Sequence, residues 1–178
     1  MERMTSTQAP QTWEFGEFFG RYPAEVCIVT TQTLAGTPTG STCTAVMALS
    51  DSPPSLLISF MTTSNTLKQI RRSGEFGVNA MGLGGESAVR RFATKAEDKF
   101  AGVLWHSPGG DTGYSGAMLS EGVFGYAHCR VENVIEVGDH ALVVGHIDDI
   151  LPGDVSTPLL YAQRAMWFPQ AVPMEMAR

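Results

Sequence analysis

The chain has 178 residues, of which 43% are hydrophobic and 17% are charged, and its net charge is -6. This length fits one domain, and the composition supplies enough apolar material for a packed core, which excludes a disordered chain. The chain has 12 lysines and arginines against 18 acidic residues. The basic residues cluster only at 71–72 and 90–91, too sparsely for a nucleic-acid-binding face. The low charged fraction also predicts that part of the surface is buried in an oligomer.

The cysteines and the apolar runs bear on the cellular compartment. Cys27, Cys43 and Cys129 are widely spaced and form no C-x-x-C pair, a pattern typical of buried free thiols. Residues 1–12 are polar, are predicted to form a disordered leader, and lack the apolar segment of a signal peptide. Because no apolar run reaches the length of a membrane span, we expect a cytoplasmic protein without membrane association.

Hydrophobic periodicity predicts a mainly β chain with inserted helices. Aromatic residues recur at helical spacing from Trp13 to Tyr22 and predict a helix that ends before Pro23. Ser64 is a good N-cap for a second helix that ends at Gly74, and a third helix is expected over 86–94. Strands are expected at 26–31, 39–49, 56–61, 75–80, 123–133 and 141–150, and a long glycine-rich loop at 102–116.

The order of these elements indicates the topology. Most strands follow one another without long crossovers, which favours a mainly antiparallel, Greek-key type of barrel over a doubly wound parallel sheet. We expect one domain over 13–168, with an irregular C-terminal tail at 169–178.

Several motifs match known signatures poorly. Segment 81–87 lies between a strand and a helix, but Ser87 replaces the third glycine of a dinucleotide fingerprint. Segment 113–116 lacks the last glycine of a nucleophile elbow. The four histidines have no metal-ligand spacing, so no metal site is predicted, and His128 and His146 are interpreted as half-exposed structural side chains within strands.

Two segments have side chains suited to a phosphorylated ring ligand. Hydroxyl and amide groups gather at 62–66, where a helix begins after a buried strand, and such a helix start attracts anions. Ordinary helix capping would need only one of these residues. Segment 40–47 has small and hydroxylated side chains, which let a flat ring approach the backbone but also suit packing against a neighbouring sheet.

Taken in order, these pieces resemble the flavin reductase family with the FMN-binding split-barrel fold, whose members supply reduced flavin to a separate monooxygenase. The resemblance runs over about residues 14 to 167. Its segments are 18–23, 26–31, Gly40-x-Thr42, 50–54, 64–66, 76–79, 91–93, 98–103, 138–140 and 158–161.

The resemblance implies roles for particular residues. His140 of the Gly-Asp-His motif would be the catalytic residue that positions the nicotinamide, and Asp139 would either orient its imidazole or serve only the turn. The implied flavin contacts are Thr44, Ala45, Val46 and Met47 along the isoalloxazine with Thr42 beside them, Ser59 and Phe60 at the ribityl chain, Ser64, Asn65 and Thr66 at the phosphate, and Phe92 and Lys99 on the phosphate side.

The function that the resemblance implies is reduction of FMN or FAD by NADH or NADPH. The reduced flavin would pass to a partner flavin-dependent monooxygenase, and the reductase would be a homodimer. Two alternatives remain open: an enzyme of the same fold whose bound flavin acts on a specific organic substrate, and a non-catalytic protein that binds flavin or haem.

Overall fold

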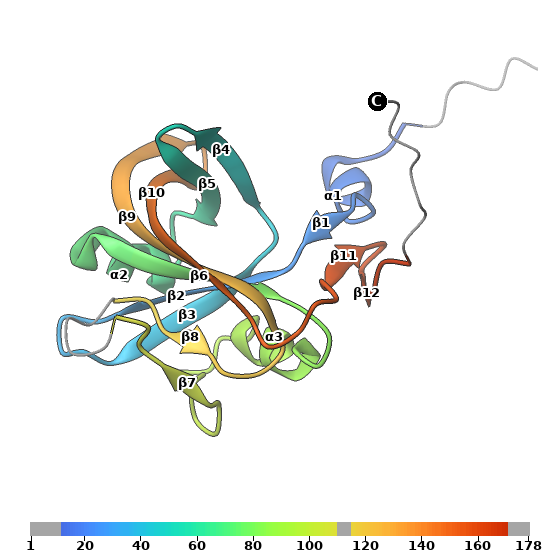
Figure 1. Cartoon of the computed structure of the whole chain (residues 1–178). Coiled ribbons are helices and arrows are strands. Elements are labelled where there is room, and N and C mark those ends of the chain that lie inside the picture. The colour runs from blue at the N-terminus through green and yellow to red at the C-terminus, as the bar shows by residue number, and fades with distance from the viewer. Residues whose placement is uncertain (1–11, 110–114, 171–178) are drawn as a thin grey trace, which may run out of the picture.

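The computed structural model describes residues 12–109 and 115–170. Its main element is a strongly curved antiparallel sheet of seven strands in the order β3-β2-β6-β9-β10-β5-β4 (Figure 1). These strands are β2 (Cys27–Gln32), β3 (Pro38–Cys43), β4 (Val46–Asp51), β5 (Pro54–Met61), β6 (Glu75–Met81), β9 (Val123–Val137) and β10 (His140–Pro152).

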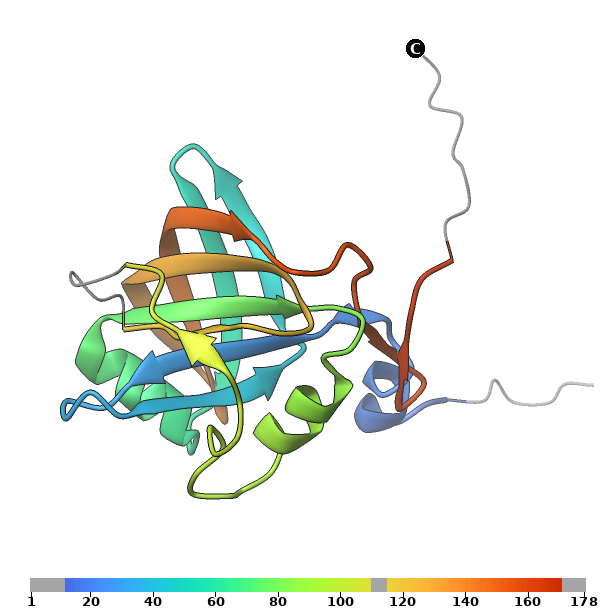
Figure 2. The same ribbon diagram turned by 60° about the horizontal axis from the view of Figure 1, so that its bottom comes forward.

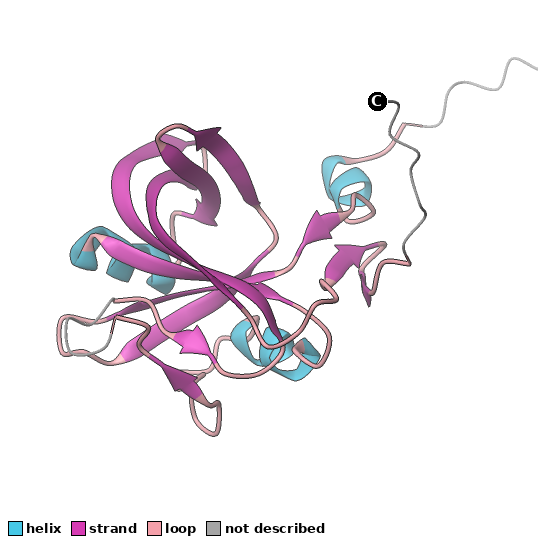
Figure 3. Cartoon of the chain, in the orientation of Figure 1, coloured by secondary structure: helices cyan, strands magenta, loops and turns pink. Residues whose placement is uncertain are grey.

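The remaining elements surround this sheet. The helices are α1 (Phe15–Phe19), α2 (Asn65–Ser73) and α3 (Glu86–Phe92). A small second sheet consists of β1 (Ala24–Glu25), β11 (Leu160–Ala162) and β12 (Ala165–Trp167), and β7 (Trp105–His106) pairs with β8 (Met118–Leu119). Figures 1 and 3 show α1 beside the small sheet, at one side of the main sheet.

Alternation along the strands divides the apolar core into two clusters. On β2, Val29 belongs to the cluster that includes Leu67 and Ile70 of α2. Its neighbour Ile28 belongs to the cluster that includes Phe92 of α3. Because successive strand residues point to opposite faces, α2 and α3 cover opposite faces of the sheet, and Figure 2 shows the two helices apart from each other.

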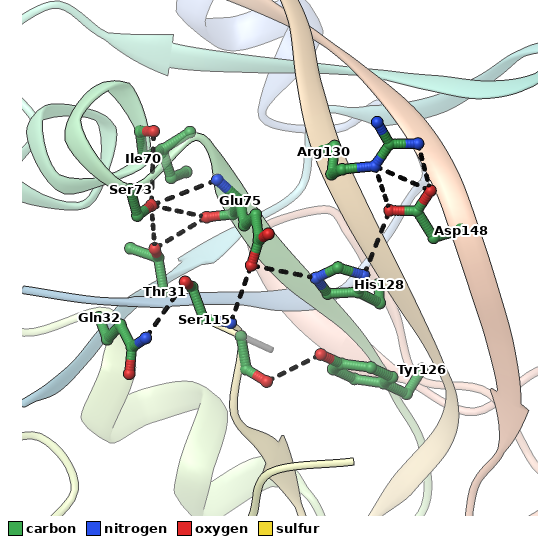
Figure 4. A network of polar contacts seen from close by, with 11 residues as sticks. Thr31, Gln32, Ile70, Ser73, Glu75, Ser115, Tyr126, His128, Arg130 and Asp148 are labelled. Carbon is green, nitrogen blue, oxygen red and sulfur yellow. Dashed lines mark hydrogen bonds and ion pairs between the residues drawn. The ribbon is translucent and has the colours of Figure 1, made fainter. Parts of the chain in front are cut away.

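A polar network crosses the sheet at β6, β9 and β10 (Figure 4). The imidazole of His128 is 1% exposed, and its nitrogens lie 3.7 Å from Glu75 Oε2 and 3.5 Å from Asp148 Oδ2. Burial lowers the pKa of His128 and outweighs the two carboxylates, which act in the opposite direction. The prediction that His128 is half-exposed is therefore wrong, whereas the His146 side chain is 26% exposed as expected.

The predicted mainly β, antiparallel organisation is confirmed, with differences in detail. The single strand predicted at 39–49 is two strands, with a break at Thr44–Ala45. The first helix is shorter than predicted, and the predicted loop at 102–116 contains β7, while its residues 110–114 lie outside the described part. The predicted leader at 1–12 and the end of the tail also fall largely outside it. In the described part of the chain, no helix is long and apolar enough to cross a membrane.

Candidate functional site

The break between β3 and β4 lies beside β5. Ser59 N donates a hydrogen bond to Ala45 O at 3.0 Å, and Val46 is the register partner of Ile58. Thr44, Ala45 and Met47 are exposed, and Val46 is half-buried. The backbone at the break is thus held against β5 while its side chains face outward.

An acidic side chain occupies one backbone donor of this segment. Val46 N donates to Glu25 Oε1 at 3.0 Å, and Glu25 comes from β1 of the small sheet. Nothing in the sequence signals this contact, because the two residues are 21 positions apart. A ring that binds along 44–47 has to compete with Glu25 for this N–H group.

The α2 N-terminus follows the same, C-terminal end of β5 after a short turn. The Ser64 hydroxyl accepts a hydrogen bond from Leu67 N at 3.3 Å, so Ser64 is the N-cap that the sequence predicts. The first N–H groups of a helix have no intrahelical partners, and no acidic residue lies in the first turn of α2. A groove of about 320 Å³ opens here, lined by Thr62, Thr63, Ser64, Asn65, Leu67, Lys68, Arg71 and Arg72.

His140 is joined to this corner through the turn between β9 and β10. Both the backbone N and Oγ1 of Thr62 donate to Asp139 O, at 2.9 and 3.1 Å. The imidazole Nδ1 of His140 lies 2.7 Å from Asp139 Oδ1, and because a carboxylate only accepts, Nδ1 donates. This hydrogen bond, together with the imidazole charge, lowers the pKa of Asp139. The imidazole is 43% exposed, so it is oriented yet accessible.

The C-terminal half of β5 therefore joins three groups of predicted residues. Ser59 contacts the β3–β4 break, and Met61, two residues later, is the register partner of His140. Ser64 follows after a short turn and caps α2. Residues from three separate parts of the sequence, 44–47, 59–66 and 139–140, thus meet at one corner of the fold.

The other predicted contacts lie elsewhere or are covered. Thr42 Oγ1 donates to Val89 O at 2.7 Å, and Lys99 Nζ donates to Phe92 O at 2.9 Å, so both side chains hold α3. The ring of Phe92 has no exposed surface and packs edge-on against Phe100, with ring centroids 4.9 Å apart. A flavin cannot touch Phe92 in this conformation, so the predicted contact needs correction: Phe92 is a core residue.

Three further predicted residues differ in their exposure. Phe60 and Thr66 are buried, at 5% and 3% exposure, and offer almost no side-chain surface, whereas Asn65 is exposed at the groove.

Burial lowers the pKa of Lys99, as expected for an ammonium whose stem is covered. Among the described residues no three histidine, cysteine or acidic side chains cluster in a way that could hold a metal ion.

Comparison with known proteins identifies the family of this chain. Residues 19–167 match the protein family described as "Flavin reductase like domain". The chain belongs to the flavin reductase family. It is 38% identical over 152 residues to a flavin reductase (NADH) of Kitasatospora aureofaciens, covering 85% of this chain and 78% of the relative. It is 36% identical over 152 residues to a flavin reductase (NADPH) of Lentzea aerocolonigenes, covering 84% of this chain and 86% of the relative.

A solved structure with a similar fold supports the same conclusion. The crystal structure of a nitrilotriacetate monooxygenase component B homologue from Mycobacterium thermoresistibile superposes with a TM-score of 0.82 at 28% identity. The match covers 92% of this chain and 90% of that chain. The resemblance that the sequence motifs indicated is therefore confirmed.

The described residues fit a flavin. The groove at α2 offers hydroxyl, amide and cationic groups and no carboxylate among its lining residues, as a phosphate requires. The β3–β4 break offers two exposed residues with small side chains, Thr44 and Ala45, which a flat ring can approach. The two features lie at opposite ends of the segment Ser59–Ser64.

Proposed function

We propose that this protein is an NAD(P)H-dependent flavin reductase that binds flavin at the C-terminal end of β5. The observation that carries the proposal is the meeting, at one corner, of a helix start without acidic residues, an exposed break between two strands and an oriented imidazole. A bound flavin supplies the chemistry, because it accepts hydride from a nicotinamide. The chain supplies position and charge.

Ser64 and the first turn of α2 would hold the flavin phosphate. The N–H groups of that turn and the positive end of the helix dipole attract a dianion, and the Ser64 hydroxyl adds a donor. Exposed Asn65 and half-buried Ser59 are within the same corner and complete the proposed contacts on the ribityl and phosphate side. Thr44, Ala45, Val46 and Met47 would lie along the ring.

His140 would position the nicotinamide. Its Nδ1 is committed to Asp139, which holds the ring in place and leaves Nε2 for the substrate. The Thr62 bonds to Asp139 O tie this turn to the helix that would hold the flavin phosphate. Alignment of two bound rings is worth much of the rate in such reactions, so a small shift of this turn should slow hydride transfer.

The position of Glu25 favours a flavin that binds reversibly. Because its carboxylate already accepts the Val46 N–H, a bound ring gains less from that donor than from a free one. Moderate affinity suits a reductase that releases its product. It fits less well with a flavoenzyme that keeps its flavin for another substrate.

The proposed partners are a second copy of the chain and a flavin-dependent monooxygenase. The monooxygenase follows from the relative that is itself a monooxygenase component. Homodimerisation is supported by exposed apolar side chains on the curved sheet, among them Met47, Leu49, Met61 and Val137. We assign the domain over 13–168 to a split barrel, since the edge strands of its curved sheet, β3 and β4, are consecutive in the chain and adjoin at the break. Three buried free cysteines fit a reducing, cytoplasmic compartment.

The test is consumption of NADH and NADPH at 340 nm by purified protein with FMN or FAD added. The expected result is turnover that saturates with free flavin, and comparison of the four pairs identifies the preferred nucleotide and flavin. If neither nucleotide is consumed with either flavin, the proposal fails. If flavin remains bound through purification and turnover does not depend on added flavin, a flavoenzyme with another substrate replaces it.

A further inference from the structure

The exposed face of α2 has three cations in a chain whose net charge is -6. Lys68, Arg71 and Arg72 line the same groove as the hydroxyl groups at the helix start. Among the described residues Arg71 is paired with Glu136, at 2.7 Å, whereas Lys68 and Arg72 have no ion-pair partner. Two cations therefore remain available beside the proposed phosphate position.

We propose that Lys68 and Arg72 bind the adenylate phosphate of FAD and make FAD the preferred flavin. The proposal rests on the proposed flavin site and deepens it. FMN ends in one phosphate, which the start of α2 would hold, whereas FAD continues into a second phosphate and an adenosine. That second charge has to lie outside the first turn of the helix.

The geometry of the helix places the two cations in series from the first phosphate. Ser64, Lys68 and Arg72 are spaced by four residues, which puts them on one side of the helix at steps of about 6 Å along its axis. Side chains on a helix lean toward its N-terminus, so Lys68 covers the first turn and Arg72 covers the turn of Lys68. An extended diphosphate that leaves the helix start along the groove would meet Lys68 first.

The position of Lys68 is otherwise unfavourable. A cation in the first half of a helix opposes the helix dipole, and here no acidic side chain in the first turn compensates for it. The other two described helices have an acidic first-turn residue, Glu17 in α1 and Glu86 in α3. An external anion at the groove would remove this imbalance.

The matched variants are Lys68→Gln and Arg72→Gln, alone and combined, with Arg90→Gln as the control. Arg90 is an exposed cation on α3, so its substitution changes the net charge equally at a distance from the groove. Arg71 stays unchanged because it is paired with Glu136. Binding of FAD, FMN and riboflavin is measured by flavin fluorescence without nucleotide. KM for each flavin is measured with saturating NADH, and KM for NADPH is measured with saturating flavin.

The double variant should weaken FAD binding by about five- to tenfold, the size of losing one or two charge contacts, and should raise the FAD KM similarly. FMN and riboflavin should change by less than about twofold, and Arg90→Gln should leave all three unchanged. Equal losses for FMN and FAD, or no loss for FAD, would overturn the proposal. A rise in the NADPH KM alone would assign the two cations to a nucleotide phosphate instead and would also overturn it. If FAD binding depends on Lys68 and Arg72 as proposed but the unaltered protein reduces no flavin, only the proposed reductase function fails.

Discussion

Replacing Ser64 by aspartate separates the capping role of this residue from its proposed role at the flavin phosphate. Aspartate caps a helix as well as serine, so the bond from Leu67 N is kept and the fold should lose little stability. The new carboxylate, however, lies where the phosphate would bind. Two like charges 4 Å apart repel by about 1 kcal/mol in water and about 4 kcal/mol at the effective dielectric of a protein surface.

The groove is open to solvent, so we take about 1 to 2 kcal/mol, which corresponds to a rise in the FMN KM of roughly five- to thirtyfold. Riboflavin lacks the phosphate, so its KM should change by less than about twofold. Ser64→Ala should behave differently, because loss of the cap costs about 1 kcal/mol of folding stability, seen as a lower Tm. Ser87→Asp, an exposed site on α3, controls for net charge. An equal rise in KM for riboflavin and FMN, or an unchanged FMN KM, would refute the phosphate assignment.

Three further predictions concern the nicotinamide side and the stability of the fold. His140→Ala should lower kcat/KM for NADH by about tenfold or more and leave the flavin KM unchanged. Asp139→Asn should have a smaller effect in the same direction. A parallel rise in the flavin KM would contradict a role of His140 at the nicotinamide. Asn79 is fully buried and forms hydrogen bonds with three backbone groups at 2.8 to 3.1 Å. Asn79→Ala should therefore lower the free energy of unfolding, measured in urea, by about 3 kcal/mol. A decrease below about 1 kcal/mol would contradict this account. The folded-state pKa of His128 lies below its unfolded value of about 6.5. The free energy of unfolding therefore has its full value above pH 6.5 and falls as the pH drops through the folded pKa. The decrease is at most about 1.4 kcal/mol per pH unit, because one proton is involved. Denaturation curves at pH 7.5 and 5.5 should show a smaller difference for His128→Gln than for the unaltered protein, and an equal difference would exclude His128 as the cause.

Much of the candidate site could be read from local patterns. Ser64 was predicted as an N-cap from its place before an amphipathic segment, and the structure has its hydroxyl bonded to the backbone as predicted. Gly74 adopts a φ of 74° at the end of α2, a conformation that glycine reaches without strain. Gly138, with a φ of 61°, and Asp139 form the turn between β9 and β10, and a turn at these two residues is what the sequence indicates. These features depend on neighbours in sequence, so they do not need the rest of the fold.

Other features depended on contacts between distant segments. Thr42 and Lys99 donate hydrogen bonds to Val89 O and Phe92 O and so hold α3, which their places in the sequence do not indicate. Glu25 reaches Val46 N from a different sheet, and burial of His128 follows from the closure of β6, β9 and β10 around it. No pattern along the chain encodes which side chains meet across a fold.

The antiparallel β character of this protein, the caps and turns of its elements and its membership of the flavin reductase family could all be predicted from the sequence, because periodicity, turn residues and motif order are properties of the chain. The break at residues 44–45 within the strand predicted at 39–49, and the meeting of this break, the start of α2 and His140 at β5, became visible only in the folded chain. Strand pairing in the curved sheet joins residues about 80 positions apart, such as Met61 and His140, and no local pattern contains such a pairing. Which face a side chain presents to a ligand is set by that pairing and by the burial it imposes.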